Sequence, residues 1–234
     1  MKSKFRRAVV VLSAAAAMFV GTDLPASADV GDPGWYVGLR ALPAFSQAED
    51  EAIIGGPGGT FRQTSGGLRP SIGGGAMVGY HWSGRGLPVR TEIEYVHRVR
   101  LDFNTEAAGP PKTGYKDNVD SDGLMLNLFL DFNSGSWWRP FVGGGLGWAR
   151  NSSETRRTNT ATGASVEQDN TTDNFAYSAM AGVRVAISRN WVAEVGYRFI
   201  DLGEIDSGRF GAGDTVTADT HLANEFLIGV VYMF

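Results

Sequence analysis

Charged and apolar residues alternate along residues 89–103, VRTEIEYVHRVRLDF. Arg90, Glu92 and Glu94 occupy even positions, whereas the odd positions are mostly apolar. In an extended chain, side chains two residues apart point to the same side, so this segment has one charged face and one apolar face. Guanidinium and carboxylate groups gathered on one face could form ion pairs, select ions or relay protons.

Other segments with the same period add to this charged set. Arg184 and Glu194 flank a very short connection at residues 188–190, which predicts a cross-strand ion pair. The set as a whole could be a satisfied ionic plug, because unpaired charges in a narrow interior are costly. The alternative is a narrow or gated ion path. The residues expected to share this charged face are Arg40, Arg90, Glu92, Glu94, Arg98, Arg100, Asp102, Arg184, Glu194, Arg198 and Glu225.

The three histidines are the candidates for acid–base chemistry near neutral pH. His81 and Ser83 have a His-x-Ser spacing, but they lie at a predicted short turn. His97 lies on the apolar side of its segment with no obvious serine or carboxylate partner there, and His221 begins the last predicted strand. Nucleophilic catalysis needs a nucleophile and a base within hydrogen-bond reach. We therefore predict that the protein is not an enzyme.

Residues 118–123, NVDSDG, resemble the start of a calcium-binding loop. Asn118, Asp120 and Asp122 stand at alternate positions before a glycine, but the twelfth position is Phe129 instead of glutamate, which excludes an EF-hand. The chain has no cysteine, so it has neither a disulfide nor a thiolate for metal binding or catalysis. We predict no metal site and no cofactor, although the two aspartates could meet divalent ions at a membrane surface.

The first residues have the pattern of a secretory signal peptide. A basic head is followed by an apolar run at residues 8–20 and by the small residues Ala26, Ser27 and Ala28. A retained membrane helix would need about 20 apolar residues, and this run is shorter. We predict a signal peptide at residues 1–28 and one domain at residues 29–234.

The elements that must position the charged face are strands of about ten residues, the length that a tilted strand needs to cross a bilayer. The connections between them alternate between long (47–70, 104–118, 151–173, 203–218) and short (83–88, 133–139, 188–190). Outer-membrane barrels have such long external loops and short periplasmic turns. The fold class that we predict is therefore all-β, an eight-stranded antiparallel up-and-down transmembrane β-barrel. Its expected strands are 34–46, 71–82, 89–103, 120–132, 140–150, 175–187, 191–199 and 222–234.

A soluble lipocalin-like barrel or a β-sandwich would show the same period of two. Three features favour a membrane barrel instead. Glycines on the polar face leave room for long charged side chains inside a narrow lumen, and the chain stops on Phe234 with Tyr232 and Val230 in phase. Aromatic residues on the apolar face also gather at strand ends, where they suit the two membrane interfaces. These aromatic residues are Trp35, Trp82, Trp148, Trp191, Tyr232 and Phe234.

Four segments, WYVGLRA, WRPFVGGGLGWAR, NWVAEVGYRFIDLGE and NEFLIGVVYMF, resemble strands of the porin-like outer-membrane β-barrel family, the opacity-type surface antigens of Gram-negative bacteria. The resemblance runs through the mature chain except the loops. It implies a surface-exposed envelope protein involved in adhesion, immune recognition or limited permeability. Because the chain ends with the last predicted strand, we expect no periplasmic peptidoglycan-binding domain of the OmpA type.

We therefore expect a multi-pass barrel of the cell outer membrane, exported by the Sec route. Its expected role is structural, surface-antigen or adhesion-type, carried by four external loops on a barrel filled by ionic side chains; the alternatives are a narrow porin-like channel and, less favoured, a lipid A-modifying enzyme. The expected partners are outer-membrane lipid and lipopolysaccharide, a host or surface ligand at the loops, and the barrel-assembly machinery. The machinery would read the C-terminal signal Val230, Tyr232 and Phe234. A net charge of −4 without a basic tract excludes nucleic acid.

Overall fold

The computed structural model describes residues 33–49, 51–56, 59–63, 69–83, 87–100, 103–107, 113–132, 137–159, 163, 165–209, 215–218 and 220–234. The expected signal peptide at residues 1–28 lies outside the described residues. Within the described ranges, none of the residues forms a helix long and apolar enough to cross a membrane.

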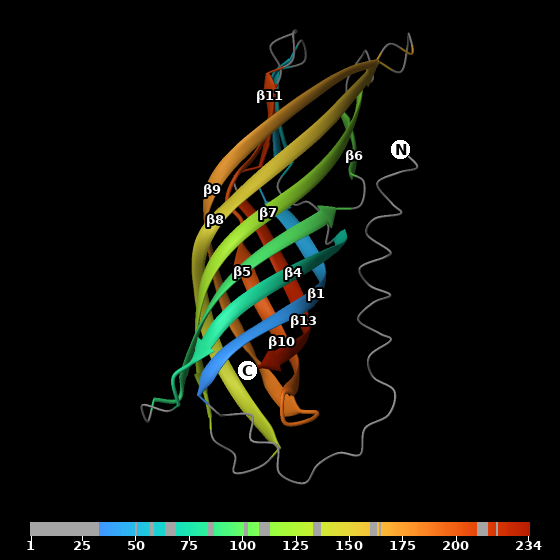
Figure 1. The fold of residues 1–234 in the computed structure, drawn as a ribbon. Coiled ribbons are helices and arrows are strands. Elements are labelled where there is room, and N and C mark those ends of the chain that lie inside the picture. Colours follow the sequence, from blue (N-terminus) through green and yellow to red (C-terminus); the bar gives the residue numbers. More distant parts are fainter. Residues whose placement is uncertain are drawn as a thin grey trace.

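Eight long strands form a closed antiparallel barrel (Figure 1). Each of these strands pairs with the long strand that precedes it and with the one that follows it in the chain, β5 with β7 included. The β1–β13 ladder joins the last strand to the first and closes the ring. Closure gives every strand a partner on both sides, as a membrane-spanning sheet requires. The predicted fold class is confirmed. The eight strands are β1 (Gly34–Glu49), β4 (Arg69–His81), β5 (Val89–Arg100), β7 (Thr113–Asp131), β8 (Trp138–Asn159), β9 (Ser165–Ala186), β10 (Trp191–Asp201) and β13 (Thr220–Met233).

The outward connections contain more strand than we predicted. β8 and β9 have 22 residues each and remain paired from Trp138↔Val185 to Thr158↔Ser165, so most of the predicted loop at 151–173 is a ribbon of paired strands. β7 continues alongside β8 over the same length, out to Thr113↔Asn159. Beyond the membrane both faces of a ribbon meet water, so the apolar alternation that marks a strand disappears while backbone pairing continues. The shorter outward strands are β2 (Glu51–Gly56), β3 (Gly59–Gln63), β6 (Phe103–Ala107), β11 (Ile205–Arg209) and β12 (Thr215–Ala218).

The apolar residues of the barrel strands face outward. In β7, Leu126 is 62% exposed and Leu128 is 53% exposed, whereas the intervening Asn127 is buried. On β10 the outward side chains are apolar from Trp191 to Phe199. About nine residues at ~3.3 Å per residue and ~45° tilt span ~21 Å, close to the height of an outer-membrane apolar band. Lipid, and not a soluble core, therefore covers this face.

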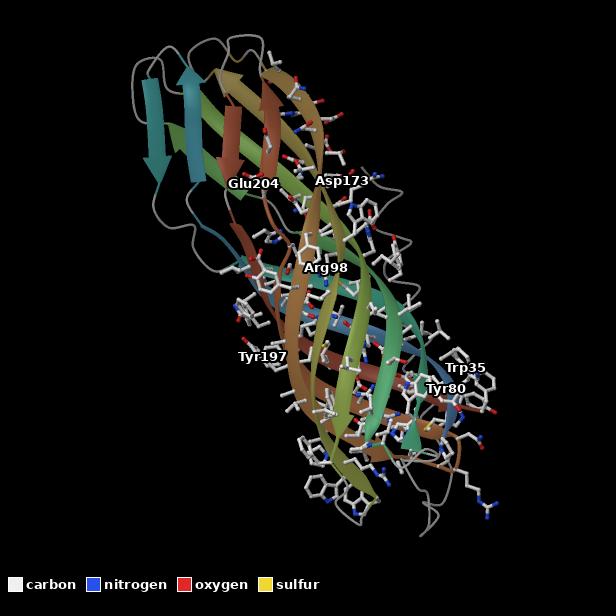
Figure 2. All side chains as sticks on the ribbon, turned by 90° about the vertical axis from the view of Figure 1, so that its left-hand side faces the viewer. Trp35, Tyr80, Arg98, Asp173, Tyr197 and Glu204 are labelled. Carbon is white, nitrogen blue, oxygen red and sulfur yellow. The ribbon has the colours of Figure 1, made fainter. Side chains whose placement is uncertain are left out.

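Aromatic side chains cluster on the rim that carries the tight turns. Trp35 and Tyr80 meet edge to face with ring centroids 5.3 Å apart, and Trp191 and Tyr232 do so at 5.0 Å. Figure 2 shows Trp35 and Tyr80 at one end of the barrel, away from Asp173. Amphipathic rings at this level suit the interface between the lipid tails and water.

Several inward-facing glycines receive large side chains from the neighbouring strand. A Cβ atom on Gly79 would overlap the Tyr36 ring, and one on Gly143 would overlap the Phe129 ring. An eight-stranded barrel is only wide enough for side chains to fill its interior. Because these glycines have no side chain, they leave the space inside the barrel that the long side chains of the neighbouring strands occupy.

Candidate functional site

The centre of the barrel is a network of ion pairs that crosses the lumen. Arg40 of β1 places Nη1 2.5 Å from Glu92 Oε1 and 3.1 Å from Glu94 Oε1, both on β5. Its Nη2 lies 2.6 Å from Glu194 Oε1 on β10. Neither β5 nor β10 is paired with β1, so these contacts reach across the interior. All four side chains are fully buried.

Toward the outward end of the barrel, Glu225 is held between two arginines. Arg198 Nε donates to Glu225 Oε2 at 2.5 Å, and Arg98 Nε donates to Glu225 Oε1 at 2.6 Å. Arg198 also donates from Nη1 to Glu94 Oε2 at 2.8 Å, which joins this cluster to the centre. Figure 2 shows Arg98 among the barrel strands, between the two ends of the molecule.

Toward the end of the barrel with the tight turns, the carboxylate that pairs with the arginines is that of Asp131. Arg90 Nε donates to Asp131 Oδ2 at 3.0 Å, and His81 Nε2 lies 3.2 Å from the same oxygen. Arg184 Nη1 lies 3.8 Å from Asp131 Oδ2. Arg90 Nη1, at 3.3 Å from Glu194 Oε2, connects this end to the centre.

Aromatic side chains contact the same buried charged groups. The Arg90 guanidinium lies over the Phe129 ring, with Cζ 3.9 Å from the centroid, and 4.9 Å from the centroid of Phe141. Tyr36 donates its hydroxyl to Glu92 Oε2 at 3.2 Å. A cation over the face of an aromatic ring is attracted by the ring quadrupole, most strongly where water is excluded. These rings therefore stabilise the charges and occupy the space between them.

The buried charges of the described residues balance. The five buried arginines are matched by five buried carboxylates, so the ion pairs leave no excess charge to attract a mobile ion. Each carboxylate accepts from or lies beside at least one guanidinium, as buried charges require. The buried cations are Arg40, Arg90, Arg98, Arg184 and Arg198, and the buried anions are Glu92, Glu94, Asp131, Glu194 and Glu225.

Most of the residues expected on the charged face meet in this network. Arg184 and Glu194 are partners in the β9–β10 register, with Arg184 Nε 3.9 Å from Glu194 Oε2. The Arg100 side chain and Asp102 lie outside the described residues. Sequence reasoning missed Asp131 as a member, although it stands in phase with the inward residues of its strand.

His221 lies at the start of the last strand, as expected. His81, expected at a short turn, is the last residue of β4, and its side chain is buried beside Asp131 inside the barrel. His97, for which we expected no carboxylate partner, lies on the outer face with Nδ1 2.9 Å from Asp122 Oδ1, because the β5–β7 register pairs the two residues. Tyr95 donates its hydroxyl to the same oxygen at 2.7 Å. Residues that are neighbours only across strands cannot be identified from spacing along the chain.

The two aspartates of the excluded calcium-loop pattern, Asp120 and Asp122, have separate partners. Asp122 is engaged by His97 and Tyr95, while Asp120 is paired with Ser152 in the β7–β8 register. Among the residues that the structure describes, no group of three or more histidine, aspartate or glutamate side chains is arranged to hold a metal ion.

Comparison with known proteins agrees with this architecture. The chain is 29% identical to the outer membrane protein PagN of Salmonella typhimurium over 174 residues, which cover 70% of this chain and 73% of PagN. It superposes on the crystal structure of Neisserial surface protein A with a TM-score of 0.51 and 14% identity, covering 86% of this chain and 97% of that one. For OprG of Pseudomonas aeruginosa the TM-score is 0.52, with 14% identity and coverage of 87% and 98%.

The family described as outer membrane protein beta-barrel domain matches residues 12–234. This match covers nearly the whole chain, and the closed eight-stranded barrel with an apolar outer band is the architecture that the family name describes. The chain therefore belongs to the outer membrane protein beta-barrel family and is a protein of the bacterial outer membrane.

Proposed function

We propose that the protein is a non-enzymatic barrel that presents a rigid polar surface outside the cell, in a structural, surface-antigen or adhesion-type role. The observation that carries the proposal is the filled interior. Arg40, Glu92, Glu94 and Glu194 have side chains that are completely buried and paired across the lumen. A barrel closed in this way acts through its outer surfaces.

Apolar layers add to the ionic ones. One buried cluster, which includes Tyr36, Met77 and Met233, lies toward the tight turns, and another, which includes Met125 and Ile200, lies toward the outward end. An ion crossing the barrel would have to displace both layers and break the buried pairs, which costs several kcal/mol for each unpaired charge. This arrangement favours a plug over the narrow channel.

The outward strands support a presenting role. Asn170 donates from Nδ2 to the Asp206 carbonyl at 2.9 Å, and Asn174 donates to the Glu204 carbonyl at 2.8 Å, so β11 is fastened to the β9 side of the ribbon. Figure 2 shows Asp173 and Glu204 close to the level where the strands leave the barrel. Binding residues are commonly carried by segments that a rigid scaffold holds in place.

Conductance in planar lipid bilayers tests the plug. We expect the folded protein to give no reproducible current steps in molar salt. A matched variant, Arg40→Ala with Glu194→Ala, removes a paired cation and anion at the centre but keeps both apolar layers, so it should also give no steps. Reproducible nanosiemens steps from the unmodified protein would disprove the plug and favour the channel.

Cysteine labelling on intact cells tests the orientation, and the absence of native cysteine makes each introduced thiol unique. Glu154, exposed on the ribbon, and Arg189, exposed in the tight turn between β9 and β10, are matched positions on opposite sides. We expect a membrane-impermeant maleimide to label Glu154→Cys on intact cells and Arg189→Cys only after lysis. The reverse pattern would refute the outward presentation.

We also propose that residues 1–28 direct export and that Val230, Tyr232 and Phe234 form the segment read during barrel assembly. The Tyr232 ring packs against Trp191 at 5.0 Å and against Phe234 at 5.2 Å, which gives the last residues a defined place on the rim. Phe234→Ala should lower the fraction of folded barrel in the outer membrane, whereas Trp137→Ala, another exposed rim aromatic, should leave it unchanged. Equal effects of the two variants would argue against a specific terminal signal.

A further inference from the structure

A polar row crosses the outer face of four adjacent strands at one level. His97 of β5 is the register partner of Asp122 on β7, Asp122 is the partner of Arg150 on β8, and Arg150 is the partner of Asp173 on β9. All four side chains are between 36% and 51% exposed. On β4 the position next to His97 is Gly74, so the charged part of the row ends at β5 on that side.

The row next to it, one step toward the membrane centre, is aromatic and apolar. Tyr95, Leu124, Trp148 and Phe175 are register partners on the same four strands and are all exposed. Aromatic rings beside an apolar band mark the level of the lipid headgroups. The polar row therefore begins where the lipid tails end, on the outward side of the barrel.

Arg150 is the cation of this row, and its geometry is defined on two sides. Its Cζ lies 4.9 Å from the centroid of the Trp148 ring, and its Nε donates to Asp173 Oδ1 at 2.8 Å. Together with the 3.3 Å bond from Nη2, the pair with Asp173 uses two of the five N–H donors of the guanidinium. An exposed ion pair of this kind is weak, so it orients Arg150 without preventing a second acceptor from binding.

We propose that Trp148 and Arg150 form a binding site for the phosphorylated sugar headgroup of an outer-leaflet glycolipid. The face of an indole ring packs against the C–H groups of a sugar, and a guanidinium binds phosphate with charge-assisted hydrogen bonds. Tyr95 and His97, both fixed on Asp122, place further polar groups at the same level for the sugar hydroxyls. The ligand reaches the site from the membrane, because the acyl chains of a glycolipid lie against the exposed apolar band.

The structure offers a matched control for each residue of the site. Arg156 lies on the same strand and the same face as Arg150 and is likewise paired with a β9 carboxylate, that of Glu167, but it lies six residues farther from the membrane. Trp191 is an exposed tryptophan of the opposite rim, packed on Tyr232. Neither control residue would contact an outer-leaflet headgroup.

The test uses the full folded barrel in detergent micelles, diphosphoryl lipid A as the probe, and native mass spectrometry to count retained lipid. We expect Arg150→Gln to lower retention roughly tenfold, the loss that one charge-assisted contact produces. Trp148→Ala should also lower retention, because the sugar loses its packing surface. Arg156→Gln and Trp191→Ala should retain lipid like the unmodified protein. Heat-modifiable gel migration verifies that each variant is folded, which its exposed position favours.

Two further arms separate the possible ligands. Phosphatidylglycerol carries a phosphate but no amino sugar, and we expect it to be retained weakly and to the same extent by Trp148→Ala and the unmodified protein. Equal retention of lipid A by Arg150→Gln and Arg156→Gln would overturn the site. Equal retention of phosphatidylglycerol and lipid A would overturn the assignment to a sugar headgroup. Neither result depends on whether the lumen conducts.

Discussion

Arg198 and Glu94 are 104 residues apart in the chain, yet Arg198 Nη1 lies 2.8 Å from Glu94 Oε2 in the interior of the barrel. The two strands that carry them, β10 and β5, are not paired with each other. The contact therefore bridges the lumen and joins opposite walls of the barrel, so its loss should affect the whole fold.

The first prediction concerns this bridge. Glu94→Gln removes the negative charge between Arg40 and Arg198, and breaking a buried pair typically costs about 3–5 kcal/mol because a charge is left uncompensated. Urea unfolding in detergent micelles, followed by tryptophan fluorescence, measures the change. Glu167→Gln, which breaks the exposed pair with Arg156, is the control and should have little effect. Similar midpoints for the two variants would contradict the structural role of the network.

The second prediction separates the two faces of one strand. A Cβ atom on Gly143 would overlap the Phe129 ring and lie 2.8 Å from the Leu128 carbonyl oxygen, whereas on Gly144 its nearest neighbour would be the Ser178 carbonyl at 3.4 Å. Gly143→Ala should therefore lower stability by about 1–3 kcal/mol through overpacking, and Gly144→Ala should not. The urea midpoint checks both, and a larger loss for Gly144→Ala would show that the inside and outside faces are assigned wrongly.

A third prediction concerns Asn151, which fastens the outward end. Its Nδ2 donates to the carbonyl oxygens of Leu202 and Glu204, both at 3.0 Å, and its Oδ1 accepts from Ser121 at 2.7 Å. Asn151→Ala leaves buried polar groups unpaired, at about 1–3 kcal/mol. Hydrogen exchange should accelerate at residues 202–206, and the neighbouring Ser152→Ala should leave it unchanged. Unaltered exchange in Asn151→Ala would mean that the ladders alone hold this segment.

The fourth prediction follows from the ribbon that replaces a predicted loop. Arg156 is paired on both sides, with Lys116 of β7 and Glu167 of β9. Proteases need a locally unpaired segment, so trypsin added to intact cells should not cut after Arg156. The same bond should be cut once the protein is heat-unfolded, which serves as the control. Rapid cleavage on intact cells would show that the ribbon opens in solution.

The sequence by itself determined the barrel and the face that each strand shows to the lipid. Side chains in a strand alternate with a period of two, so Leu126 and Asn127 had to point to opposite sides whatever the neighbouring strands are. Aromatic residues such as Trp35 and Trp191 marked the rim for a reason that is equally local, their amphipathic rings. The cross-strand position of Arg184 and Glu194 was also predictable, because only a very short turn separates their strands.

Only the tertiary structure decided which charges meet. Arg198 joins Glu94, and His97 joins Asp122, because barrel closure and strand register bring together residues far apart in the chain. The register also extended β8 and β9 beyond the membrane, where polar residues carry no period that marks a strand. Which ion pairs form across a lumen depends on the positions of several strands at once. Whether a side chain points inward or outward depends on its own strand alone.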